Sequence, residues 1–281
     1  MYHNKRFSGN TPDYWEDNWG QSDFEQAVKF CVIDPLRPLF EKYLFPGAIM
    51  FEGGCGLGNY VAYYTARGWR VIGLDFAQKT LKRLREYQPN LPVCVGDVSK
   101  LPFGDEVFDL YYSGGVVEHF ESGPELALSE ARRVLKRNGI LLVSVPYLNP
   151  LREFLYYFKK DTWRKVKKEE IDLEEIEGKS FFQYVYRPSE FKNALSDAGF
   201  EVIETKGYSI LWGLYDIPFL QKVLERLATY NTTKSKEILP EKAQSSRVDL
   251  EVLVKEQHPS LLKRLVVSED KTIPLAGTFL S

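Results

Sequence analysis

Four glycines within six residues mark the part of the chain where a ligand could approach the backbone most closely. They lie in the run FEGGCGLG at residues 51–58, directly after the acidic side chain of Glu52. Glycine allows a tight turn, and its missing Cβ leaves room for a bound molecule. An apolar run precedes the glycines and a helical pattern follows them. We therefore interpret residues 53–58 as a strand-to-helix turn that binds a small molecule; the competing interpretation is a turn without a ligand.

Two further carboxylates follow predicted strands. Asp75 ends the apolar run at 71–74, and Asp97 follows Gly96 after a short strand at 93–95. In open α/β sheets, ligands bind outside the carboxyl ends of the strands, where an acid can accept both hydroxyls of a ribose. The competing interpretation for both acids is a helix N-cap.

A candidate proton acceptor comes later in the chain. Glu118 and His119 follow a predicted strand at 108–112, and His119 is one of only three histidines. Imidazole and carboxylate groups are common general bases in enzymes. Either side chain could therefore deprotonate a substrate near the glycine turn. The alternative for His119 is that it orders a turn.

An alternation of strand and helix patterns must position these residues. Strands are predicted at 48–52, 69–74, 93–95, 108–112 and 140–145, with helices at 59–67, 80–87 and 124–136. Near-continuous apolar strands separated by helices are typical of a parallel sheet that is covered on both faces. We therefore expect a doubly wound α/β fold.

A turn is predicted at Asn138-Gly139, between the helix at 124–136 and the strand at 140–145. The alternation is then interrupted at residues 146–187, where aromatic and charged stretches predict an insertion over the carboxyl edge of the sheet, with a helix at 151–160 and an edge strand at 181–186. It resumes with a helix at 188–198 and a strand at 200–205. Residues 250–254 and 265–267 each fit one more strand, and pattern alone does not choose between them. We expect a helical cap at 1–45 and a main domain at 46–281 that contains the insertion.

A dinucleotide fingerprint, G-x-G-x-x-G, is the natural competitor for the glycine run. Gly54 and Gly56 fit its first two glycines, but Asn59 stands where the third is required. The fingerprint also makes no demand for an acid such as Asp97 after the third strand. A nicotinamide-dependent oxidoreductase is therefore the weaker interpretation.

In order and spacing, these segments resemble the class I S-adenosylmethionine-dependent methyltransferases. The run EGGCGLG is similar to the first motif of that family, and VIGLD at 71–75 is similar to the strand that ends in its ribose-binding acid. Residues 96–109, with GDV, LPF and FD, are similar to the segment whose acid receives the adenine amino group.

Two later segments extend the resemblance. They are SGGVVEHF at 113–120 and RRVLKRNG at 132–139, the latter with Asn138 in place of the commoner Pro or Gly. The resemblance covers residues 45–206 and is strongest to ubiquinone-biosynthesis-like small-molecule methyltransferases.

The resemblance implies a Rossmann-like sheet of seven strands in the order 3-2-1-4-5-7-6, with strand seven antiparallel. It also implies which residues bind S-adenosylmethionine. The positions carried over are Glu52, Gly53, Gly54 and Gly56 (methionine part), Asp75 (ribose), Phe76, Asp97 and Val98 (adenine), and Ser113 and Gly114 (sulfonium).

Aromatic residues make up 14% of the chain, and several lie outside the segments that read as core. Tyr14, Trp15 and Trp19 precede the first strand, so this segment is free to lie across the carboxyl edge. Such aromatic groups supply rigid contact area for a pocket. We expect them to close over the occupied site; the alternative is a helix packed permanently on the sheet.

Composition narrows the function classes. Lys and Arg number 37 against 39 Asp and Glu, a net charge of −2 that argues against a dedicated nucleic-acid binder. The chain has no apolar run of about 18 residues and no apolar N-terminal signal core. Three cysteines without a CxxC pair cannot build a zinc site or a disulfide framework by themselves. We expect a cytoplasmic protein without a metal.

The sequence does not identify the methyl acceptor or the atom that is methylated. It also does not show whether a base is needed or what the oligomeric state is. We expect methyl transfer from S-adenosylmethionine to a nitrogen, oxygen or carbon nucleophile of a small molecule, such as an amine, a quinone, a phenol or a lipid, with S-adenosylhomocysteine as product. The alternatives are an NAD(P)-dependent oxidoreductase and a non-catalytic cofactor-binding or scaffold module.

Overall fold

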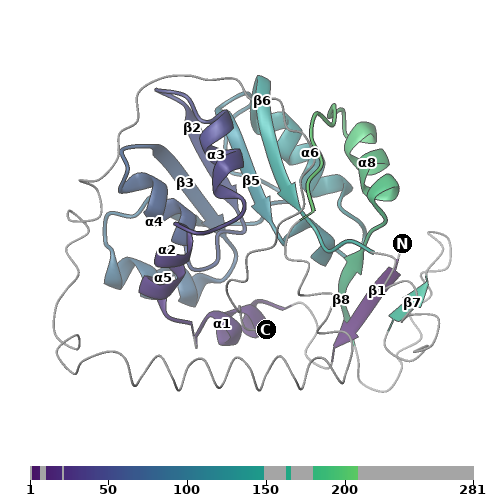
Figure 1. Ribbon diagram of the computed structural model, residues 1–281. Coiled ribbons are helices and arrows are strands. Elements are labelled where there is room, and N and C mark those ends of the chain that lie inside the picture. The colour runs from purple at the N-terminus through teal and green to yellow at the C-terminus, as the bar shows by residue number, and fades with distance from the viewer. Residues whose placement is uncertain (1, 7–10, 21, 149–162, 166–179, 208–281) are drawn as a thin grey trace. The chain divides into compact units, whose positions relative to one another are not determined.

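The computed structural model describes residues 2–6, 11–20, 22–148, 163–165 and 180–207 (Figure 1). The chain divides into two units, Met1–Asp216 and Ile217–Ser281, and every described residue lies in the first. The helix predicted at 151–160 and the two candidates for a last strand lie outside the described residues.

A parallel sheet of five strands forms the centre of the first unit. The strands are β2 (Ile49–Gly53), β3 (Arg70–Asp75), β4 (Val93–Val95), β5 (Phe108–Gly114) and β6 (Leu135–Ser144). They lie in the order β4-β3-β2-β5-β6, and every neighbouring pair is parallel. Counted along the chain this is 3-2-1-4-5, which confirms the Rossmann-like fold and its first five strands.

Helices cover both faces of this sheet (Figure 1). The alternation of side chains along each strand explains why, since Met50 and Tyr112 point to one core cluster and Phe51 and Tyr111 to the other. The first cluster is covered by α2 (Phe24–Phe30), α3 (Arg37–Tyr43), α4 (Asn59–Thr65) and α5 (Gln78–Tyr87), and the second by α6 (Glu125–Val134) and α8 (Pro188–Asp197).

Helix α6 passes directly into β6, without the turn predicted at Asn138-Gly139. The helix ends at Val134 and the strand begins at Leu135. Main-chain bonds explain the early start, because the Val107 N–H donates to the Val134 carbonyl and Phe108 pairs with Leu135. The predicted helix therefore ended two residues too late, and the predicted strand began five residues too late.

The N-terminal region contains the predicted helices and also an unpredicted strand. Helix α1 (Pro12–Gly20) is followed by α2 and α3, while β1 (Tyr2–Arg6) precedes them. Strand β1 lies between β7 (Trp163–Lys165) and β8 (Ser180–Val185) in a separate antiparallel sheet. Helix α3 packs on the core of the central sheet, since Phe40 is fully buried against Tyr60 and Tyr112.

The strand predicted at 200–205 does not form among the described residues. Residues 200–207 follow α8 without regular structure, and β6 is the last strand of its sheet there. A strand requires a hydrogen-bonded neighbour, and the described residues supply none for this segment. The helix predicted at 188–198 and the edge strand predicted at 181–186 are confirmed as α8 and β8.

Candidate active site at the carboxyl edge

The glycine turn connects β2 to α4 and is held by the end of β3. The Gly54 and Cys55 N–H groups both donate to the Leu74 carbonyl, at 2.7 and 3.0 Å. Gly54 and Gly56 have φ values of +76° and +49°, a region that L side chains rarely adopt. The N–H groups of Gly54 and Cys55 are already bonded inside the fold. At these two residues the turn therefore offers a ligand an open backbone surface rather than free hydrogen-bond donors.

Asp75 lies at the centre of this arrangement. Its carboxylate accepts from the Gly56 N–H at 2.7 Å and from the Ala77 N–H at 2.8 Å. Burial raises the pKa of Asp75, while the backbone donors Ala77, Gly56 and Phe76 oppose that shift. The bond to Ala77, two residues on, is an Asx-turn rather than a helix N-cap. Asp75 therefore fixes the glycine turn to β3, and each oxygen keeps a lone pair for a further donor.

Glu52 is buried directly before the glycines. Its side chain is 4% exposed, and among the described residues Oε2 has no hydrogen-bond partner. Burial raises the pKa of Glu52 well above its usual range; a bond from the Val61 N–H opposes this and the Asp75 charge adds to it. An unsatisfied buried carboxyl costs stability unless a ligand supplies a donor.

Asp97 follows β4 at the same edge and is exposed. Its Oδ1 accepts from the Ser99 N–H and from the Ser99 hydroxyl, both at 2.8 Å. Next to it, the Val98 side chain is buried in the core cluster on the α6 face. The carboxylate is thus held by a compact turn, again an Asx-turn rather than an N-cap, and faces outward from the sheet edge.

Two polar groups are buried at the end of β5. Ser113 and Glu118 are each 2% exposed, and the Ser113 hydroxyl and the Glu118 Oε2 have no partner among the described residues. Gly114 adjoins Ser113 on the strand, and Glu118 lies in the short 3-10 helix η1 (Val117–His119). Burial raises the pKa of Glu118 to about 8. Glu118 is therefore a carboxyl that holds its proton near neutral pH.

His119 is held by a strand far away in the sequence. Its Nδ1 lies 2.8 Å from the carbonyl oxygen of Phe182 in β8. A carbonyl only accepts, so Nδ1 carries the proton and the neutral ring presents Nε2 as its acceptor. Beyond ordering a turn, the contact leaves His119 with an oriented basic nitrogen.

Helix α1 lies over both the glycine turn and His119. Trp15 meets the His119 ring edge-on with a centroid separation of 5.0 Å, stacks with Trp19 and lies against Phe182. Trp19 lies over Gly56, where an added Cβ would come within 2.9 Å of the indole. We name Tyr14, Trp15, Trp19, His119 and Phe182 the aromatic cap. Trp15 and Trp19 thus lie beside His119 and the glycine turn, and the closure of this segment over an occupied site stays a prediction.

Two basic residues of α5 attach α1 to the sheet edge. Lys79 bonds Glu16 through its main-chain N–H at 3.0 Å and through Nζ at 2.6 Å. The Arg83 guanidinium donates to the Trp19 and Gly20 carbonyls, at 2.6 and 2.9 Å. The pKa of Glu16 is lowered by its bonds with Lys79. The sequence interpretation overlooked both residues, because their spacing on α5 gives no sign of a partner some 60 residues earlier.

A comparison with family models matches residues 51–143 to the description "Methyltransferase domain". That span begins one residue before Glu52 and includes Asp75, Asp97, Ser113 and His119. Residues 51–143 form a class I S-adenosylmethionine-dependent methyltransferase domain. S-adenosylmethionine is the cofactor of this family, so the oxidoreductase interpretation is set aside.

Two relatives illustrate the similarity of this chain to known proteins. An uncharacterized protein of Methanocaldococcus jannaschii is 28% identical over 205 residues, which cover 69% of this chain and 78% of the relative. A malonyl-[acyl-carrier protein] O-methyltransferase of Serratia marcescens is 32% identical over 121 residues, 43% of this chain and 45% of that protein. The match with this chain thus spans less than half the length of the Serratia marcescens protein.

The solved structure of a Pyrococcus horikoshii protein is 26% identical to this chain, with a TM-score of 0.46. The match covers 60% of this chain and 80% of the chain of that protein.

Within the described part of this chain, no group of three or more His, Cys, Asp or Glu residues could hold a metal ion. The helices described there are also all too short or too polar to span a bilayer.

A cavity of about 850 Å³ lies at the outer edge of β6, away from the glycine turn. Residues 140–145 line one side of it and residues 199–207 another; Gly115 and Glu118 line it near the end of β5. It does not touch Asp75 or Asp97. Its lining therefore includes neither of the carboxylates that follow β3 and β4.

Proposed function

We propose that the chain transfers a methyl group from S-adenosylmethionine to a nucleophilic nitrogen, oxygen or carbon of a small molecule. The observation that carries the proposal is the position of three carboxylates, Glu52, Asp75 and Asp97, after or at the ends of three adjacent strands around one glycine turn. When bound, S-adenosylmethionine supplies an electrophilic methyl group on a positively charged sulfur, and S-adenosylhomocysteine is left after transfer.

The residues present fit this cofactor. The buried Glu52 Oε2 lacks a partner among the described residues and suits the ammonium group of the methionine part. Asp75 keeps acceptor capacity for ribose hydroxyls, and Asp97 with the Val98 amide suits the edge of adenine. Phe76, 39% exposed beside Asp75, offers an apolar surface for the ring. Gly53, Gly54 and Gly56 leave the approach open, and Ser113 and Gly114 are the residues proposed nearest the sulfonium.

On the acceptor side, we assign His119 the role of general base. Its Nδ1–H donates to the Phe182 carbonyl, so Nε2 is the nitrogen that can take a proton from an O–H or N–H nucleophile. Glu118 is the second candidate, and because burial raises its pKa to about 8 it would act as a base only once it has ionised above neutral pH. Alignment of the acceptor and exclusion of water supply the rest of the catalysis.

The aromatic cap would exclude water from the reacting groups. Helix α1 reaches from the glycine turn to His119, so one element borders both the cofactor and the acceptor. We propose that it closes over the occupied site, held by Lys79 and Arg83. A small-molecule acceptor fits this enclosed edge better than nucleic acid, and the net charge of −2 agrees.

We also propose the complete sheet, 3-2-1-4-5-7-6, for a main domain of residues 46–281 with a cap at 1–45 and an insertion at about 146–187. Support comes from the cavity beside β6. The outer edge of β6, which has no neighbouring strand among the described residues, borders it on one side and residues 199–207 on another. An antiparallel strand between them would satisfy both sets of main-chain groups.

Calorimetry tests the cofactor assignment directly. We expect S-adenosylhomocysteine to bind the wild-type protein and NADH to give no response. The reverse result would overturn the assignment. Binding without turnover on amine, phenol, quinone and lipid acceptors would favour the alternative of a non-catalytic cofactor-binding module, and mass spectrometry of ligands co-purified with the protein would identify the acceptor class.

A further inference from the structure

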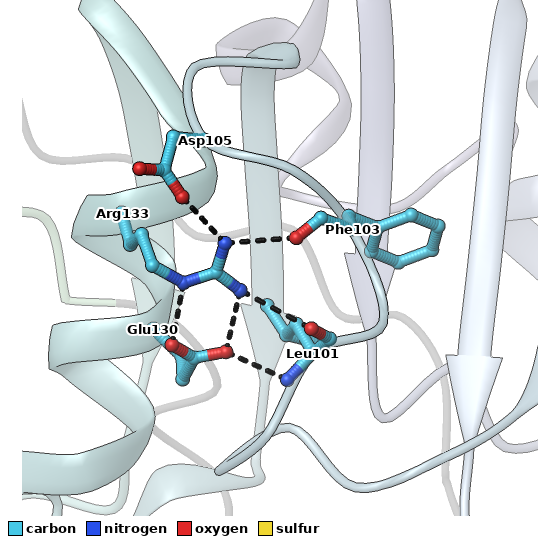
Figure 2. A network of polar contacts seen from close by, with 5 residues as sticks. All are labelled: Leu101, Phe103, Asp105, Glu130 and Arg133. Carbon is cyan, nitrogen blue, oxygen red and sulfur yellow. Dashed lines mark hydrogen bonds and ion pairs between the residues drawn. The ribbon is translucent and has the colours of Figure 1, made fainter.

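Arg133, on the last turn of α6, holds the loop that follows β4. One guanidinium nitrogen donates to the Phe103 carbonyl at 2.8 Å and pairs with Asp105 at 2.8 Å (Figure 2). The other terminal nitrogen donates to the Leu101 carbonyl at 3.1 Å. A planar guanidinium is suited to such multiple contacts, because its donors have a fixed geometry.

Glu130, one turn earlier on the same helix, completes the network. Its Oε1 accepts from Arg133 Nε at 2.7 Å, and its Oε2 accepts from Arg133 Nη2 at 2.8 Å and from the Leu101 N–H at 2.7 Å. Figure 2 shows the two side chains of α6 directed together at the loop. Both main-chain polar groups of Leu101 are therefore bound by one ion pair.

Leu101 is joined to Asp97 by a compact turn. The Lys100 N–H donates to the Asp97 carbonyl at 3.0 Å, and Ser99 binds the Asp97 carboxylate. The side chains of Val98 and Leu101 are both buried on the α6 face of the sheet. Fixing Leu101 to α6 thus fixes the direction in which the Asp97 carboxylate faces, although Arg133 itself has no contact with that carboxylate among the interactions described.

We propose that Arg133 and Glu130 are positioning residues for adenine recognition, acting through the loop that carries Asp97. This inference rests on the proposed function, in which Asp97 accepts a hydrogen bond from the adenine amino group. Selectivity for adenine would then depend on an ion pair on a different helix. A hypoxanthine base has a carbonyl oxygen where adenine has its amino group. This oxygen cannot donate a hydrogen bond to the Asp97 carboxylate, because both groups are acceptors.

The test compares two ligands that differ at C6 and N1 of the purine, where adenine has an amino group and a bare nitrogen and hypoxanthine has a carbonyl oxygen and an N–H. Calorimetry with S-adenosylhomocysteine and S-inosylhomocysteine measures the preference of the wild-type protein, which we expect to be at least about tenfold for adenine because the bond involves a charged acceptor. In Arg133→Met, we expect this preference to fall at least about threefold, because the loop is no longer fixed. Arg132→Met, an exposed neighbour on α6, should keep the preference within about twofold.

A merely structural role gives a different result, because general loosening lowers both affinities by the same factor and leaves the preference unchanged. Glu130→Gln provides the second variant, since its amide oxygen can still accept from the Leu101 N–H while the charge is lost. A wild-type preference that is unchanged in both variants overturns the positioning role and leaves the proposed function standing. Wild-type protein that binds neither ligand overturns the proposed function itself.

Discussion

Trp19 lies against Gly56, so that a methyl group added to the glycine would come within 2.9 Å of the indole. The two residues belong to different elements, α1 and the turn after β2, and their contact brings the N-terminal segment onto the cofactor loop. In the proposed function, a molecule held at the turn must share this surface with the indole. Binding at the turn and the position of α1 are therefore linked.

Gly56→Ala should weaken S-adenosylhomocysteine binding and lower stability. The backbone at φ +49° strains an alanine, at a cost of roughly 1–2 kcal/mol, and the new Cβ also meets Trp19. Gly68→Ala is a matched control, since Gly68 has φ +82° and nothing within 4 Å of an added Cβ. In urea unfolding Gly68→Ala should lose stability through backbone strain alone, and Gly56→Ala should lose at least as much; only Gly56→Ala should also lose affinity.

Adding Trp19→Ala to Gly56→Ala should restore part of the lost affinity, because it removes the contact and leaves the backbone strain. Calorimetry on the four proteins of this cycle measures the coupling. Strictly additive effects would show that the indole and the ligand do not share the surface over Gly56.

Asp75→Asn should destabilise the protein by about 1–3 kcal/mol, because one of the Gly56 and Ala77 N–H groups would face the amide nitrogen. Asp97→Asn, at an exposed position, should change stability by less than about 0.5 kcal/mol. Both should weaken S-adenosylhomocysteine binding. Equal loss of stability in the two variants, measured by urea unfolding, would contradict the assigned roles.

Stability should fall as the pH rises, through Glu118. Its folded-state pKa is raised to about 8, above the unfolded value, so the unfolded chain loses this proton first. The stabilisation is complete below about pH 4 and is lost progressively up to about pH 8, by roughly 5 kcal/mol for this group. Urea unfolding at pH 5, 7 and 9 should show this decline, and Glu118→Gln should be flatter. Parallel curves for the two proteins would rule out Glu118 as the source.

The His119 ring should carry its proton on Nδ1 at pH 8. The Phe182 carbonyl accepts from that nitrogen, which leaves Nε2 as the basic atom. Nitrogen-15 chemical shifts of the ring distinguish the two tautomers. A proton on Nε2 would exclude the proposed base.

Helix α1 should exchange its amide hydrogens more slowly in the presence of S-adenosylhomocysteine. Arg83→Ala removes the donors to the Trp19 and Gly20 carbonyls and should speed exchange at 11–20 without ligand. Lys82→Ala is the control, because Lys82 is exposed and lies next to Arg83 on helix α5. Protection of 11–20 that is identical with and without ligand would leave α1 as a permanent part of the fold.

The central sheet could be predicted because its signals are local. The apolar runs around Phe51, Leu74 and Leu110, and the glycines after the first of them, lie within a few residues of the structure that they specify. The Asp75 and Asp97 positions followed from the same rule. Their roles in binding remain proposals, but their placement at adjacent strand ends is as the sequence indicates.

The contacts that close the site could not be predicted, since they join residues far apart in the chain. His119 meets Phe182, Arg83 meets Trp19, and Leu101 meets Glu130, in each case through main-chain groups that carry no sequence signature. Glu130 and Arg133 are three residues apart on one helix, a spacing that allows an ion pair, but nothing in that spacing indicates that the pair also binds a loop.

Strand β1 has a consequence for how the chain is made. His3 pairs with Tyr184, 181 positions later, and β1 lies between β7 and β8. At ribosomal rates of about 5–20 residues per second, the first strand waits roughly 10–40 s for its partner to be synthesised. The central sheet up to β6 can emerge and fold in that interval. During the same time β1 has no partner strand and is accessible to chaperones. The order of synthesis therefore leaves the small sheet that supports His119 to assemble last.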